Sequence, residues 1–107
     1  MGMAMLTTLG VLAEPNRQAI LDLLCEGELP VGDLVARLGV SQPAVSKHLR
    51  VLRDAGLVSV RADAQRRLYR IRPEPLAELD AWLAHYRKFW SVSLDRLEEH
   101  LDHRRNL

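Results

Sequence analysis

The sequence contains one cysteine, no long apolar run and few aromatic residues. A single thiol, Cys25, excludes an intrachain disulfide and a metal cage built from several cysteines. We expect Cys25 to be a small core residue of a helix, because no second thiol is present to make it a redox switch. One cysteine in 107 residues is also typical of a protein kept in a reducing compartment.

Segments that would place the chain in or across a membrane are missing too. The apolar stretches are only a few residues long, whereas about 20 residues are needed to span a bilayer as a helix. The first residues, Met1–Met5, lack the basic flank and the long apolar run of a signal peptide. We therefore expect a cytoplasmic protein with no membrane partner.

The residue patterns of an enzyme are equally scarce. The sequence shows no Ser/His/Asp constellation, no glycine loop suited to holding phosphates, and no carboxylate pair suited to acid–base chemistry. No cofactor is expected either. A binding function fits this sequence better than catalysis.

What the sequence does contain is an uneven distribution of charge. The net charge is only +1. Between residues 37 and 72, however, nine basic residues stand against two acidic ones, giving +7, while the remaining residues have six basic and twelve acidic side chains, giving −6. A basic centre in a nearly neutral chain indicates a polyanionic partner that meets one face, although a solvated face with scattered arginines would give the same composition.

Apolar periodicity predicts a single domain, residues 1–107, that is mainly helical with a small β-hairpin. Its first two helices are amphipathic, and the second begins at Pro15 and is closed by Gly27. The first helix has an apolar stripe formed by Met5, Leu6, Leu9 and Leu12.

A helix-turn-helix is predicted over about residues 31–55. Its first helix covers roughly residues 31–38, after which Gly39 supplies the positive φ needed to leave a helix. Ser41 is a good N-cap for the second helix, and Pro43 is tolerated in its first turn. A short helix, a turn with glycine and a second helix with a polar outer face define this motif.

A β-hairpin, the wing, is predicted over about residues 57–72, because apolar and polar residues alternate on both sides of residues 63–65. No Asn-Gly or similar tight turn is present, so we expect a longer, mobile loop at its tip. Apolar residues at steps of three and four then predict one long helix over about residues 75–103. The whole pattern, four helices followed by two strands and a last helix, is that of a winged helix-turn-helix.

The outward positions of the second motif helix are polar and basic. In helix-turn-helix proteins the N-terminal part of this helix enters the major groove, where base edges can be told apart. Gln42, Ser46 and Lys47 are therefore candidates for reading bases. Ser41, Arg50 and Arg53 are candidates for phosphate contact, although Arg50 and Arg53 taken alone fit an ordinary charged helix surface equally well.

Two further predictions concern neighbouring residues. Arg66 and Arg67 follow the tip of the wing and can contact the DNA backbone or the minor groove, unless they only discourage edge-to-edge pairing of the strand. His48 is expected to be a partly buried helix histidine that makes a local hydrogen bond.

Several segments together resemble the ArsR/SmtB family of bacterial winged-helix repressors. They are residues 12–17, 28–34, 41–49 and 55–58, with Leu52 and Tyr69. The resemblance implies a homodimer formed through the first and last helices, and binding to an operator that blocks transcription. It also implies that the family's base-contacting positions fall on Gln42, Pro43, Ser46 and Lys47.

The departures from this family pattern concern its sensor sites and its wing. Where many members have metal-binding cysteines, this chain has Pro30 and Gly32, which cannot ligate. A second family site would need more than His100 and His103, so these are weak metal candidates and we predict no metal. The glycine usual near the wing tip is replaced by Gln65. The last helix is similar to that of the metal-free branch.

Most of the aromatic residues lie in the predicted last helix, over a face wider than one buried stripe requires. Such a surplus of apolar surface favours self-association as a two-fold dimer. The predicted interface consists of Met5, Leu9, Trp82, Tyr86, Phe89, Trp90, Leu94 and Leu97.

These patterns predict a sequence-specific DNA-binding transcriptional regulator, a repressor that binds double-stranded DNA at a palindromic operator as a homodimer. Two alternatives stay open: a metal- or redox-sensing repressor of the same fold, and a winged helix used as a protein-interaction module. These patterns do not identify the operator, the regulated genes or any small-molecule effector. They also do not distinguish repression from activation.

Overall fold

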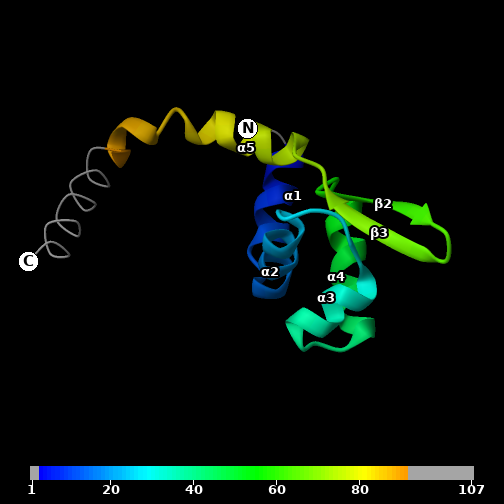
Figure 1. The fold of residues 1–107 in the computed structure, drawn as a ribbon. Coiled ribbons are helices and arrows are strands. Elements are labelled where there is room, and N and C mark those ends of the chain that lie inside the picture. The colour runs from blue at the N-terminus through cyan, green and yellow to red at the C-terminus, as the bar shows by residue number, and fades with distance from the viewer. Residues whose placement is uncertain (1–2, 92–107) are drawn as a thin grey trace, which may run out of the picture. The chain divides into compact units, whose positions relative to one another are not determined.

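The computed structural model describes residues 3–91, which form helices and one small sheet (Figure 1). The chain divides into two compact units, Met1–Ala77 and Glu78–Leu107. The elements in chain order are α1 (Met3–Leu12), α2 (Pro15–Leu24), β1 (Leu29–Pro30), α3 (Val31–Leu38), α4 (Gln42–Asp54), β2 (Val58–Asp63), β3 (Arg66–Ile71), α5 (Glu74–Leu83) and the 3₁₀ helix η1 (Arg87–Phe89). None of the helices among these residues is long and apolar enough to cross a membrane.

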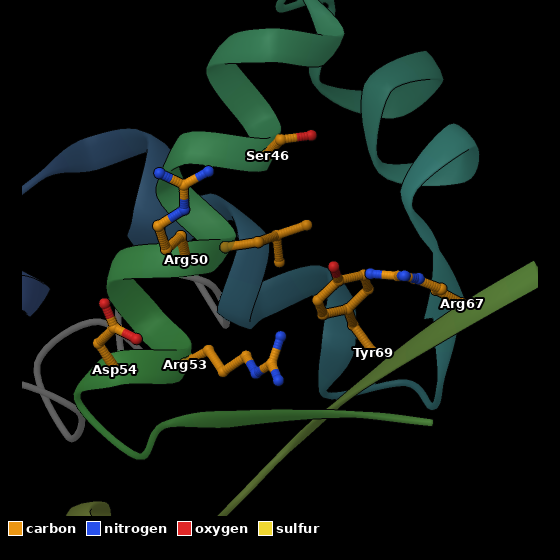
Figure 2. Close-up of a pocket in the computed structure, with 7 residues that line it drawn as sticks. Ser46, Arg50, Arg53, Asp54, Arg67 and Tyr69 are labelled. Carbon is orange, nitrogen blue, oxygen red and sulfur yellow. The ribbon is translucent and has the colours of Figure 1, made fainter. Parts of the chain in front are cut away.

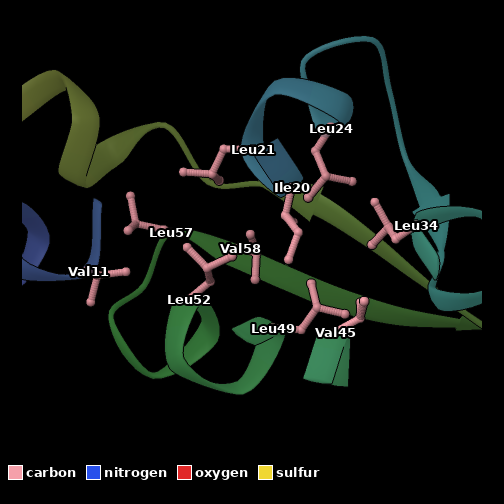
Figure 3. Packing of buried hydrophobic residues seen from close by; sticks show 10 residues of the cluster. All are labelled: Val11, Ile20, Leu21, Leu24, Leu34, Val45, Leu49, Leu52, Leu57 and Val58. Carbon is pink, nitrogen blue, oxygen red and sulfur yellow. The ribbon is translucent and has the colours of Figure 1, made fainter. Parts of the chain in front are cut away.

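The core of the first unit lies where α2, α3 and α4 meet the sheet (Figure 3). Its most deeply buried side chains are Ile20, Leu34, Val45, Leu49, Leu52, Leu57 and Val58. Burying one such side chain contributes about 1.5–3 kcal/mol relative to leaving it exposed. Because three of the seven belong to α4, this helix is fixed along its whole length.

The predicted helix-turn-helix is confirmed nearly residue by residue. Gly39 has φ 67°, the left-handed conformation that ends α3. Ser41 caps α4, its side chain accepting a hydrogen bond from the Ala44 N–H at 3.3 Å. The motif therefore needs only local residues to set its turn.

Two predictions about the first helices are wrong. In α1 the buried residues are Thr8 and Val11, whereas Leu6 is exposed. This helix is apolar nearly all round, so its spacing could not define one inner face; the buried Thr8 hydroxyl is satisfied by donating to the Ala4 carbonyl.

The second error concerns Cys25, which is exposed and not part of the core. α2 ends at Leu24, short of Gly27, and Cys25 is its C-cap. The helix packs through Ile20, Leu21 and Leu24, and Cys25 lies beyond the last residue of that face.

The sheet differs from prediction in two ways. Leu29 and Pro30 form an additional edge strand, so the antiparallel order is β1-β3-β2. The wing tip is a tight turn, because β2 and β3 pair up to Asp63 opposite Arg66, leaving only Ala64 and Gln65 between them. Ala64 has φ 56° and takes the conformation that glycine usually provides. The expectation of a longer loop is therefore wrong.

The predicted continuous last helix is also wrong within the described residues. α5 ends at Leu83, and a turn leads into η1. The backbone bonds tighten here to i→i−3, as from the Tyr86 N–H to the Leu83 carbonyl at 2.9 Å. The His85 ring nitrogen lies 3.1 Å from the Trp82 carbonyl, and α5 buries no residue that would hold a straight axis. Residues 92–103 of the prediction lie outside the described part.

An ion pair ties the edge strand to the far strand of the wing. The Arg61 guanidinium donates from Nε to Glu28 Oε2 at 2.7 Å and from Nη2 to Oε1 at 3.0 Å. These hydrogen bonds hold the pKa of the Glu28 carboxyl below its ordinary value, and they raise the pKa of Arg61. Glu28 precedes β1, whereas Arg61 lies on β2, so the pair spans the central strand.

We expect Glu28→Gln to lower the stability of the protein at neutral pH. A carboxyl whose pKa is lowered by folding stabilises the fold above its unfolded pKa and loses that contribution as the pH falls through its folded pKa. Urea unfolding from pH 7 down to pH 2.5 should therefore show a small deficit for the variant that closes in acid. A deficit that is constant over this range would contradict the ion pair as its cause.

Candidate nucleic-acid interface

α4 separates its residues into two faces. Val45, Leu49 and Leu52 are buried against the rest of the unit. The exposed side chains of α4 include all those predicted to meet DNA, Gln42, Pro43, Ser46, Lys47, Arg50 and Arg53, and also the acidic Asp54 in the last turn. Ser41, the N-cap, is exposed too. The sequence-predicted residues are thus brought together on one helix surface.

A second anchor of α4 was not foreseen correctly. His48 is partly buried, with 17% of its side chain exposed, as predicted. Its partners, however, are not local: they are Arg17 on α2 and Glu14, the N-cap of α2. Arg17 Nε donates to His48 Nδ1 at 3.4 Å, and Glu14 Oε2 lies 3.7 Å from the same nitrogen.

This cluster of three residues, Glu14, Arg17 and His48, joins the start of α2 to the middle of α4. Glu14 is also the N-cap of α2, accepting from the Arg17 N–H at 2.9 Å. One set of contacts therefore holds both the start of α2 and the middle of α4, the candidate reading helix. Pro15 predicts the start of this helix, but no local pattern indicates that the Glu14 carboxylate reaches α4.

The cations near α4 differ in whether an acid neutralises them. Within residues 3–91 no carboxylate lies within 4 Å of Lys47, Arg50, Arg53 or Arg67, whereas Arg66 Nη2 is 3.1 Å from Asp63 Oδ2. The two wing arginines predicted together are therefore unequal. Arg67 leaves its charge available, while Arg66 is paired at the tip.

A hollow of about 360 Å³ lies between α4 and the wing (Figure 2). α4 contributes Ser46, Arg50, Arg53 and Asp54 to its lining, and β3 contributes Arg67 and Tyr69. Tyr69 was matched to a family pattern by sequence but not predicted as a site residue. The strand alternation Arg67-Leu68-Tyr69, with Leu68 buried, was the available signal that residues 67 and 69 share a face.

The predicted interface residues occupy both units. On α1, Met5 and Leu9 are half-buried. In the second unit Phe89 is 71% exposed and Tyr86 44% exposed, and Trp82 meets Tyr86 edge to face with ring centroids 5.4 Å apart. Trp90 is half-buried. Leu94 and Leu97 lie outside the described residues.

The metal candidates His100 and His103 lie outside the described part of the chain. Pro30 and Gly32, at the start of α3, have no ligating side chain. Among residues 3–91 no group of three or more His, Cys, Asp or Glu side chains is placed to hold a metal ion.

Comparison with known proteins gives a family. Residues 14–60 match the family described as bacterial regulatory protein, arsR family. The HTH-type transcriptional regulator Rv2034 of Mycobacterium tuberculosis is 42% identical over 91 residues, covering 85% of this chain and 82% of its own. The biofilm growth-associated repressor of Agrobacterium fabrum is 41% identical over 71 residues, covering 66% of this chain and 61% of its own.

Solved structures agree with this match. The crystal structure of a possible transcriptional regulator for arsenical resistance superposes with a TM-score of 0.66 at 44% identity, covering 86% of this chain and 93% of that chain. The architecture is a winged helix-turn-helix. The chain belongs to the ArsR family and is a DNA-binding transcriptional regulator.

We expect Ser41→Ala to lower the free energy of unfolding by about 1 kcal/mol, because it removes the side-chain acceptor that caps α4. Ser46→Ala is the matched control, since it truncates an exposed serine inside the same helix and should be neutral or slightly stabilising. Urea unfolding of both variants measures the difference. Equal effects of the two substitutions would argue against the cap.

Proposed function

We propose that the protein represses transcription by binding a palindromic operator as a homodimer in the cytoplasm. The observation that carries this proposal is the exposed face of α4. Its cations, and Arg67 of the wing beside it, have no carboxylate within 4 Å among residues 3–91. Its relative from Agrobacterium fabrum is named a repressor, which supports repression over activation.

Base recognition is assigned to the first two turns of α4. Gln42 has the paired donor and acceptor that match adenine, Ser46 can donate or accept, and Lys47 can reach guanine. Pro43 occupies the same turn and offers an apolar contact. All four side chains are exposed, so a major groove can receive them without any change in α4.

Backbone contact is assigned to residues around this reading surface. Arg50 and Arg53 lie further along α4 and Ser41 at its start, while Arg66 and Arg67 begin the second wing strand. Phosphate contacts of this kind fix the protein on the duplex and make affinity fall with salt. Arg66 would first have to exchange Asp63 for a phosphate.

Pairing of two subunits is assigned to the predicted interface residues, which are Met5 and Leu9 of α1, the aromatic residues Trp82, Tyr86, Phe89 and Trp90, and Leu94 and Leu97. A side chain as apolar and exposed as Phe89 is unfavourable in water, and covering it in a two-fold dimer would remove that cost. Such a dimer places two reading helices about 34 Å apart on one side of the duplex.

We expect the double substitution Gln42→Ala with Ser46→Ala to abolish sequence preference. Its affinity for an operator selected from random DNA should fall by about 2 kcal/mol, or roughly thirtyfold, because base-edge hydrogen bonds are lost. Affinity for random duplex should be nearly unchanged. Fluorescence anisotropy measures both.

The control for this experiment is Gln18→Ala, which truncates an exposed glutamine on α2. It should leave both affinities as they are. An equal loss of the double variant on operator and random DNA would count against base reading by these residues.

We expect the protein to be dimeric at micromolar concentration and Phe89→Asp to weaken the dimer at least tenfold, because a carboxylate would be buried in the interface. Analytical ultracentrifugation over a dilution series measures this. Glu78→Ala, at an exposed position of α5, is the control. A wild-type protein that is monomeric throughout the micromolar range would refute the dimer.

A further inference from the structure

Tyr69 occupies a special place between the wing and α4. It lies on the central strand β3, opposite Leu29 of β1 on one side and Val60 of β2 on the other. Its ring is half-buried and packs against the hydrophobic core. Pairing on both sides together with core packing fixes the ring, so the position of its hydroxyl is set before any ligand arrives.

The hydroxyl of Tyr69 has no hydrogen-bond partner within the described part of the chain, residues 3–91. It is accessible to solvent, because these residues contain no buried side-chain oxygen or nitrogen without a partner. The ring lines the hollow between α4 and the wing and also a second hollow that reaches the start of α3. A fixed phenol with an open O–H therefore borders accessible space.

Two guanidinium groups flank this phenol. Arg67 precedes Tyr69 by two residues on the same face of β3, and Arg53 comes from the last turn of α4; in Figure 2 both extend toward the ring. Neither has a carboxylate within 4 Å among the described residues. The acid that lines the hollow, Asp54, lies on the other side of Arg53 from Tyr69 in Figure 2.

We propose that Arg53, Arg67 and Tyr69 form a seat for one phosphodiester group of the DNA strand that passes between α4 and the wing. The two guanidinium groups supply charge-assisted N–H donors, and the phenol supplies a neutral O–H donor to a non-bridging oxygen. This seat rests on the proposed function, since it requires DNA along α4. It adds Tyr69, which ties the wing to the reading helix through a shared phosphate.

The test is Tyr69→Phe, which removes the hydroxyl and keeps the ring in the core. Affinity for both operator and random duplex should fall at least about tenfold, because a hydrogen bond to a charged group is lost. The slope of log affinity against log salt should not change, since no charge is removed. Arg67→Gln should lower that slope by about one.

Gln18→Ala is again the control, because Gln18 is exposed on α2 and lies outside the residues assigned to DNA contact or to pairing of subunits. It should bind as the wild type does. A Tyr69→Phe variant with unchanged affinity would overturn the seat, while a wild type without salt-dependent DNA binding would overturn the proposed function and the seat with it.

Replacing single phosphates of the DNA by neutral linkages identifies the phosphate that Tyr69 contacts. Single methylphosphonates are placed one at a time along the selected operator. At one linkage per half-site the loss caused by Tyr69→Phe should disappear; a loss that persists at every linkage would overturn the seat.

A titration with inorganic phosphate alone separates a DNA strand from a free anion as the source of the phosphate. It should show no saturable binding at millimolar concentration. Saturable binding that Tyr69→Phe abolishes would assign these residues to a free anion, contrary to the proposal.

Discussion

The packing of Val45, Leu49 and Leu52 against the core is the constraint on which the candidate interface depends. These three residues are at most 1% exposed. Successive residues of a helix are about 100° apart around its axis, so a fixed inner seam also fixes where Gln42, Ser46 and Lys47 point. The outer side chains gain their direction without making a tertiary contact themselves.

The contact of His48 with Arg17 and Glu14 adds a second restraint at the side of α4. The hydrophobic seam and this polar contact with the start of α2 both hold α4 in place. Both restraints come from residues far apart in the sequence. A helix held in this way would lose little conformational entropy if it met DNA as proposed.

Local chemistry explains which parts of the fold could be predicted from the sequence. Gly39 and Ser41 set the bounds of α3 and α4 through their own backbone and side chain, so neighbouring residues sufficed. β1 is two residues long and exists only because β3 lies beside it, and the tight turn at Ala64 is imposed by the register of the strands around it. The end of α5 at Leu83 likewise reflects missing packing, which no apolar spacing reveals.

The charged residues show the same contrast: their number can be read from the sequence, whereas their pairing depends on the fold. The sequence alone shows the excess of basic residues between residues 37 and 72. Some of these residues are paired with acids in the described part of the folded chain, so fewer of them have charge available for a ligand. Arg61 is bound by Glu28, and Arg66 by Asp63, because strands and loops bring those acids to them. Sequence could place arginines on the wing; it could not tell which of them an acid would meet.

Strand alternation connects these observations at the wing. Residues directly opposite in an antiparallel pair share a face, so Arg67 and Tyr69 lie with Ala62 and Val60, on the side that faces the hollow beside α4. The other face carries the cations that have partners, including Arg70, whose Nε donates to the Ser59 hydroxyl at 3.1 Å. A shift of register by one residue would exchange the two faces. The pairing of β1 with β3 and the Glu28–Arg61 bridge oppose such a shift, and so keep Arg67 and Tyr69 on the side of the hollow beside α4.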